Sequence, residues 1–335
     1  MTGLIAVESK VMNNGAAGYE NFFAKWIKYV SNPASVKAYT KGVKNFFNFC
    51  KGNGISSIDR DVIQAYREYL NPAKTGAKYK ASTANLYLTA TKLFCGFLYQ
   101  ERIIEINVAE RIKNFKVSEQ HTKDALSAST TKRIITSFDI VQAEIEKDTA
   151  LTSKKRQASI FKNVRDKAIY AIMTCCGLRC VEVQRANKAD LVNRGEKTFL
   201  QVQGKGRDDK AECVEVPSGV LNLVNQYLAE RGVLADDAPL FASVSRRNFG
   251  GRLTTNSISR IIKGIFRANG IDTPRITAHS LRHTCANTMI LNNVDLRRVQ
   301  EVLRHRNITV TQRYLHELDR YNNGGECVAA AAFGL

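Results

Sequence analysis

The sequence predicts a mainly helical (α+β) protein in which a small helical bundle precedes a larger helical domain with one small antiparallel sheet. The chain has 335 residues, which is long for one average domain and sufficient for two that each bury a core. Apolar residues recur mostly at three- and four-residue steps, and period-two alternation is confined to two short segments in the second half. The 44% hydrophobic and 24% charged residues are ordinary for a folded globular protein.

The first domain is predicted over residues 19–115 as a bundle of amphipathic helices. Each segment carries its apolar side chains on one face. The third helix is stopped by Asn71-Pro72, and Ser82 is the expected N-cap of the fourth. The expected helices run over 19–30, 36–50, 61–70 and from Ser82 onward.

A polar loop precedes the fourth helix, and its cations Lys74, Lys78 and Lys80 either neutralise DNA phosphates or are simply solvated. A second polar stretch, KVSEQHTKDALS over 116–127, interrupts the helical periodicity. Few contacts cross such segments, so the boundary between the two domains is expected there.

The second domain is predicted over residues 128–320 and is again mostly helical. A buried helix from Phe161 to Cys176 is ended by Gly177 in the left-handed conformation. Two strands, Thr198 to Gln203 and Glu212 to Val216, are expected to form a hairpin with a basic tip. Further helices with apolar stripes are expected over 220–228, 258–266, 281–291 and 296–303.

Fifty Lys and Arg against 31 Asp and Glu leave a formal charge of +19. Such an excess is best matched by a polyanion, and nucleic acid is the leading partner. No apolar run approaches the roughly 20 residues of a membrane span, and the N-terminus lacks the order of a signal peptide. We therefore expect a cytoplasmic protein with no membrane partner, whose eight cysteines are reduced and fill the core rather than bind metal.

The chemistry-bearing residues are concentrated in the second domain. His279, Arg282 and His283 open a helix at i, i+3 and i+4, so they share one face on which a phosphate can sit. Arg179 follows the Gly177 turn and precedes Glu182 by one helical turn, which lets a carboxylate orient the guanidinium. Further along come Leu303-Arg304-His305 and, nine residues later, Tyr314.

Taken together, these motifs resemble the tyrosine recombinase (phage integrase) family, and the likeness covers nearly the whole chain. Residues 19–115 resemble the helical, SAM-like core-binding domain that contacts DNA, and residues 128–320 resemble the catalytic domain. Residues 1–18 and 321–335 are then terminal tails. The apolar segment from Val328 to Phe333 is either a subunit-docking segment or a frayed terminus.

The resemblance implies site-specific cleavage and rejoining of DNA through a 3′-phosphotyrosyl intermediate, for DNA integration, excision or resolution. Tyr314 matches the nucleophile and His279 the base beside it; a free phenol is only about 0.1% ionised at neutral pH and needs such help. Arg179 and Arg282 match the family's pair of arginines, which clamp the non-bridging oxygens.

The remaining site residues follow from the same match. Lys205, on the hairpin, takes the place of the acid that protonates the departing 5′ oxygen, with Lys210 as the substitute. His305 matches a second histidine that hydrogen-bonds the phosphate, and Glu182 matches the acidic support of the first arginine. His283 is a further supporting residue and Arg207 a candidate DNA contact. No metal or other cofactor is expected, because the cations of the site stabilise the phosphate.

Two positions depart from the family pattern: Arg304 stands where Gly is frequent, and Cys176 where Thr is common. We predict that neither touches the chemistry.

Two other functions are compatible with parts of the pattern. A type IB topoisomerase-like enzyme uses the same phosphotyrosine chemistry to relax supercoils, and a non-catalytic basic protein would only bind DNA. A recombinase of this family works as a homotetramer on two DNA duplexes. The short segment before the first helix favours a simple target with inverted half-sites. The sequence does not identify the target DNA, the direction of the reaction or accessory proteins.

Overall fold

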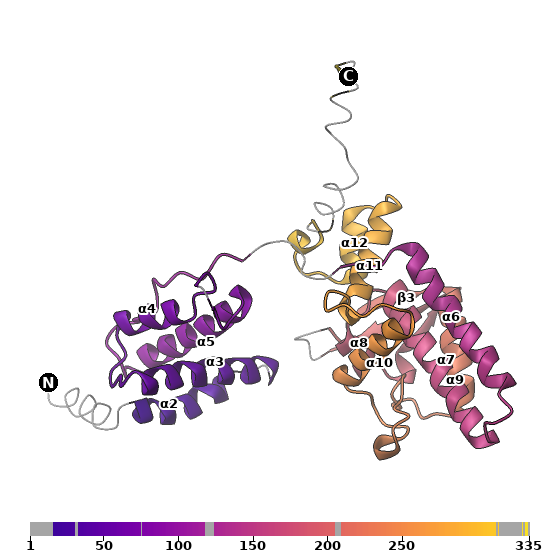
Figure 1. Cartoon of the computed structure of the whole chain (residues 1–335), viewed down its shortest axis with the longest axis horizontal. Coiled ribbons are helices and arrows are strands. Elements are labelled where there is room, and N and C mark those ends of the chain that lie inside the picture. The colour runs from indigo at the N-terminus through magenta and orange to yellow at the C-terminus, as the bar shows by residue number, and fades with distance from the viewer. Residues whose placement is uncertain are drawn as a thin grey trace. The chain divides into compact units, whose positions relative to one another are not determined.

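The computed structural model describes residues 16–30, 33–74, 76–117, 124–204, 209–312, 314, 330 and 332–333, and Figure 1 labels its α-helices and the strand β3. They form two compact units, Met1–Ser118 (unit 1) and Glu119–Leu335 (unit 2). The described residues are mainly helical and include one three-stranded antiparallel sheet, which confirms the predicted fold class.

Unit 1 contains α2 (Ala16–Tyr29), α3 (Pro33–Gly52), α4 (Arg60–Tyr69) and α5 (Ala81–Gln100). The four predicted helices are therefore present, but the expected N-cap of the last one is wrong. The extended backbone residue is Lys80, whose carbonyl oxygen accepts the first helical hydrogen bonds from the N–H groups of Thr83 and Ala84 at 2.9 Å. Ser82 lies inside the first turn, where its side chain cannot act as the cap.

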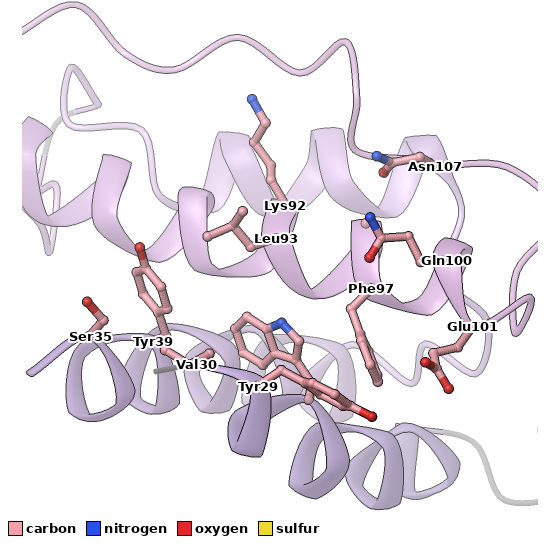
Figure 2. Close-up of a pocket in the computed structure, with 12 residues that line it drawn as sticks. Tyr29, Val30, Ser35, Tyr39, Lys92, Leu93, Phe97, Gln100, Glu101 and Asn107 are labelled. Atoms are coloured by element: carbon pink, nitrogen blue, oxygen red, sulfur yellow. The ribbon is translucent and has the colours of Figure 1, made fainter. Parts of the chain in front are cut away.

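The core of unit 1 is strongly aromatic, with Phe46, Tyr66 and Phe94 fully buried between α3, α4 and α5. Beside this core lies a hollow of about 700 Å³. Figure 2 shows that Phe97 of α5 faces Tyr29 of α2 there, and their ring centroids are 5.9 Å apart. No residue assigned to chemistry lines this hollow in the described part of the chain.

Unit 2 is built around α7 (Ser153–Cys175), which packs against α6 (Ala128–Lys147) and α9 (Ser218–Arg231) (Figure 1). The helices α8 (Cys180–Arg185), α10 (Thr255–Ala268), α11 (Ala278–Leu291) and α12 (Leu296–Leu303) complete the unit with the short turns η1 (Lys188–Asp190) and η2 (Arg246–Asn248). The α6 helix was not predicted. Its buried residues are only Ile134 and Phe138, so its apolar stripe is thin.

The sheet has the order β1 (Leu191–Arg194), β2 (Lys197–Val202) and β3 (Glu212–Val216). The pairing of β2 with β3 confirms the predicted hairpin, with Leu200 opposite Val214 and both side chains buried. The β1 strand was missed because its four residues, LVNR, show no alternation.

Within the described residues, no helix is long and apolar enough to span a membrane. The cysteines of that same part of the chain are free thiols.

Candidate active site

The first arginine lies at a sharp turn between α7 and α8. Gly177 takes a left-handed conformation with φ of +57°, and a Cβ added there would lie 2.7 Å from Leu303 Cδ2. The turn sets Arg179 at the N-cap of α8. Its backbone N–H and its Nη1 each donate to Glu182 at 2.8 Å, one to each carboxylate oxygen. The guanidinium is thus oriented by the carboxylate, as the spacing predicted.

The carboxylate of Glu182 is fully buried and has a second cationic partner. Arg304 Nη2 donates to Glu182 Oε2 at 2.8 Å. Burial raises the pKa of Glu182, but the Arg304 guanidinium, together with the backbone N–H and guanidinium of Arg179, outweighs it and lowers the pKa below the ordinary value. Glu182 is therefore ionised at neutral pH.

The second arginine of the predicted pair, Arg282, extends from α11 and is 1% exposed. Its Nη1 donates to the Gly177 carbonyl oxygen at 2.6 Å, and its Nη2 donates to the Leu303 carbonyl oxygen. The side chain therefore links the turn after α7 to the end of α12. Burial, Arg179 and Arg304 lower the pKa of Arg282 to about 9, which leaves it protonated at neutral pH.

Three histidines and Tyr314 form a ring cluster beside these arginines. The rings of His279 and His283 are 4.7 Å apart, that of His283 is 5.1 Å from Tyr314, and His305 stacks on Tyr314 at 6.2 Å with an interplanar angle of 3°. His279 is exposed at the start of α11, whereas the Tyr314 side chain is 2% exposed. The predicted nucleophile thus lies buried between two imidazoles.

His305 is a neutral imidazole at physiological pH. Burial and the guanidiniums of Arg282, Arg179 and Arg304 lower its pKa to about 3. Its Nδ1 shares a 2.9 Å hydrogen bond with the hydroxyl of Thr311, and the Thr311 side chain is fully buried. If the hydroxyl donates to Nδ1, the proton of the neutral ring stands on Nε2.

The structure brings together most of the predicted site residues: Arg179, Glu182, His279, Arg282, His283, His305 and Tyr314. Lys205 and Arg207 lie outside the described residues. Lys210, the alternative acid, forms an ion pair with Asp190, its Nζ lying 2.5 Å from Oδ2.

The candidate DNA contacts of unit 1, Lys74, Lys78 and Lys80, are exposed. Lys74 lies 3.8 Å from a carboxylate oxygen of Glu68, and Lys78 lies over the ring of Tyr79.

Two contributors were missed from the sequence: Arg304 and Thr311. Arg304 was predicted not to touch the chemistry; its contact is with the supporting carboxylate of Glu182, so this stays a prediction. The presence of Arg304 where the family often has Gly was visible in the sequence. Its partner Glu182, however, lies 122 residues earlier in the chain. Cys176, the other departure, is buried, and its thiol contacts the Glu215 carbonyl oxygen at 3.6 Å.

The described charged side chains around Glu182 carry a net positive charge. Among the described residues, the guanidiniums of Arg179, Arg282 and Arg304 face one carboxylate, that of Glu182. Arg282 uses one N–H on each of two nitrogens for backbone carbonyls, and a guanidinium carries five N–H donors. The arrangement can therefore accept a further anion, with an imidazole and a phenol close by.

Comparison with known proteins gives matches along most of the chain. Residues 145–320 match the model described as the phage integrase family, and residues 23–102 match that of the phage integrase N-terminal SAM-like domain. A tyrosine recombinase XerC of Thermodesulfovibrio yellowstonii is 29% identical over 307 residues, covering 89% of this chain and 91% of the relative. Another XerC, of Pelobacter propionicus, is 30% identical over 292 residues, covering 86% and 87%.

Solved structures share the fold. The XerH site-specific recombinase bound to palindromic difH substrate has a TM-score of 0.64 at 19% identity, covering 88% of this chain and 79% of that chain. A lambda integrase tetramer bound to a Holliday junction has a TM-score of 0.59 at 14% identity, covering 88% and 76%.

Proposed function

This chain belongs to the phage integrase family of tyrosine recombinases, and we propose that it is a site-specific DNA recombinase that cleaves and rejoins strands through a 3′-phosphotyrosyl intermediate. The observation that carries the proposal is the convergence of Arg179, Arg282 and His305 beside Tyr314 with cationic charge in excess. A backbone phosphate is an anion of suitable size and geometry for two guanidiniums.

In the proposed reaction the phenol oxygen of Tyr314 attacks the scissile phosphorus, and its proton passes to His279. Arg179 and Arg282 hold the non-bridging oxygens, on which negative charge grows in the transition state. His305, neutral at physiological pH, donates a hydrogen bond to the same phosphate from Nε2. The bond to the 5′ oxygen breaks, and Lys205 gives that oxygen a proton. The reverse steps, with the 5′ hydroxyl of a second strand as nucleophile, join the exchanged strands.

The choice of Lys205 over Lys210 is supported by the ion pair of Lys210 with Asp190. That ion pair holds the Lys210 ammonium at Asp190, so its N–H donors are directed at a carboxylate of the protein and not at a departing oxygen. The partner is double-stranded DNA with inverted half-sites, bound by a homotetramer that holds two duplexes. Lys74, Lys78, Lys80 and Arg207 are proposed phosphate contacts.

The test is adduct formation on a nicked suicide duplex, followed by denaturing electrophoresis. The wild type should form a covalent protein-DNA adduct and Tyr314→Phe should not. Tyr99→Phe, at a tyrosine of unit 1 that is 48% exposed, is the matched control and should react as the wild type does. An adduct formed by Tyr314→Phe would show that another residue is the nucleophile. Relaxation of supercoils without exchange between two duplexes would favour the topoisomerase alternative.

A further inference from the structure

Two features of Arg304 are energetically unfavourable: its backbone conformation and the burial of its charged side chain. It is the C-cap of α12 in the left-handed conformation, with φ of 54° and ψ of 48°, which residues with a Cβ disfavour. Its side chain is 3% exposed, and a buried cation is tolerated only when it is well paired. Both features call for a compensating interaction specific to this side chain.

The contacts of Arg304 connect it to both arginines of the proposed phosphate clamp. Its Nη2 donates to Glu182 Oε2 at 2.8 Å, while Arg179 Nη1 donates to the other oxygen, Oε1, at 2.8 Å. The same Nη2 lies 3.3 Å from the Gly177 carbonyl oxygen, which also accepts from Arg282 Nη1 at 2.6 Å. Arg304 therefore shares one acceptor group with Arg179 and another with Arg282.

We propose that Arg304 is a positioning residue that fixes Glu182 and the Gly177 carbonyl, so that Arg179 and Arg282 direct their remaining N–H groups at the DNA phosphate. The inference rests on the proposed function. With Arg304 on Oε2, Arg179 contacts the carboxylate through one guanidinium nitrogen only. Without Arg304, Oε2 keeps only the bond from the Arg179 backbone N–H and can accept a second guanidinium nitrogen of Arg179, since bidentate pairing is the preferred geometry of such pairs. Arg179 would then have fewer donors for the phosphate.

Arg304→Gly is the informative substitution, because glycine adopts the left-handed conformation without strain and the turn is preserved. Arg102→Gly is the matched control: Arg102 also has a left-handed backbone, with φ of 56°, but it is exposed on unit 1. Arg304→Lys keeps the charge and loses the planar guanidinium. Adduct formation on the suicide duplex should fall roughly 10- to 100-fold in Arg304→Gly, less in Arg304→Lys, and not in Arg102→Gly.

The pH profile separates positioning from a general structural role. The charged groups facing Glu182 are Arg179 at the start of α8, Arg304 at the end of α12 and Arg282 from α11. Losing one of these cations weakens the hold on the ionised carboxylate, so the acid limb of the cleavage profile should move to higher pH in Arg304→Gly. In a Glu182→Gln background, which has no carboxylate to titrate, Arg304→Gly should produce no such shift.

A melting-temperature cycle tests the pairing without any activity. Arg304→Gly should lower the melting temperature of the wild type, and leave unchanged or raise that of Glu182→Gln, in which Arg304 has lost its charged partner. An equal decrease in both backgrounds, or wild-type cleavage by Arg304→Gly at every pH, would overturn this inference alone. A wild type that forms no adduct would overturn the proposed function and, with it, the role of Arg304 in cleavage.

Discussion

The two units bury different kinds of side chain. In the described part of unit 1 the buried set is aliphatic and aromatic apart from Thr91 and the thiols, whereas unit 2 buries the charged residues Arg165, Asp166, Glu182, Asp190, Arg282 and Arg304. Apolar burial stabilises at any pH, but buried charges stabilise only while they remain paired. The stability of unit 2 should therefore depend on its charge network, and that of unit 1 should not.

The chain supplies its own probe for this comparison. Trp26 is the only tryptophan and is 6% exposed in the core of unit 1. Its fluorescence therefore follows the unfolding of unit 1, while calorimetry follows both units.

The largest effect is expected from Glu182→Ala. Removing the buried carboxylate leaves Arg304 and Arg179 without their shared partner, and breaking a buried ion pair in this way costs about 3–5 kcal/mol. The calorimetric transition of unit 2 should fall, and the Trp26 transition should stay in place. Glu215→Ala is the control, because its ion pair with Lys197 lies on the exposed surface of the sheet and is worth at most about 1 kcal/mol. Equal shifts of both transitions in Glu182→Ala would remove the distinction between the units.

Gly177→Ala should have the next largest effect. The left-handed backbone costs about 1–2 kcal/mol for a residue with a Cβ, and the 2.7 Å approach to Leu303 Cδ2 adds overpacking, for a total of about 2–4 kcal/mol. Gly54→Ala in unit 1 isolates the backbone part, since φ is +63° there and the added Cβ meets nothing within 4 Å. Chemical denaturation monitored by circular dichroism measures both. If Gly177→Ala loses no more folding stability than Gly54→Ala, then α12 shifts without cost to make room for the added Cβ.

The features that were predicted correctly from the sequence depend on residues close together in the chain. The α12 helix was predicted over its observed range because its apolar residues keep a strict helical period. His279 and His283 were placed together correctly because a helix fixes residues four apart on one face. Such inferences use only neighbours along the chain.

The parts that were missed depend on distant neighbours or on weak local patterns. Arg304 meets Glu182 across 122 residues, and no periodicity encodes that contact. Thr311 was overlooked because a buried hydroxyl is recognised only through its partner, His305. The β1 strand forms because β2 offers it an edge, with Leu191 opposite Leu200, rather than through its own four residues.

Lowering the pH should destabilise unit 2 more than unit 1, by a smaller amount than the two substitutions above. The pKa of His305 is lowered to about 3 by burial and by Arg282, Arg179 and Arg304, while in the unfolded chain it lies near 6.5. Between these values only the unfolded state takes up the proton, so stability falls as the pH drops below about 6.5, by up to roughly 2 kcal/mol at pH 5. The lowered pKa of Glu182 adds a loss only below about pH 4.3.

Calorimetry at pH 7.5 and 5 should therefore show a loss in unit 2 with little change in the Trp26 transition. His305→Asn, which cannot titrate, should lose less stability over the same interval. A loss of the same size in His305→Asn would assign the pH dependence to other groups.

The smallest change in stability is expected from Thr311→Val, which keeps the shape of the side chain and removes the hydroxyl bonded to His305 Nδ1 at 2.9 Å. Thr311 is fully buried, so the lost hydrogen bond should cost about 1 kcal/mol. Thr309→Val, at an exposed threonine in the same helical turn over 308–312, should cost less.

The effect of Thr311→Val on cleavage should exceed its effect on folding. If the Thr311 hydroxyl keeps the His305 proton on Nε2, then without it neither the tautomer nor the orientation of the ring is fixed. Adduct formation should therefore fall roughly tenfold while the protein remains folded. Thr309→Val should cleave as the wild type does. Adduct formation by Thr311→Val at the wild-type rate would show that His305 needs no second residue to present its N–H. The buried polar contacts of unit 2 near Tyr314 would then serve stability rather than catalysis.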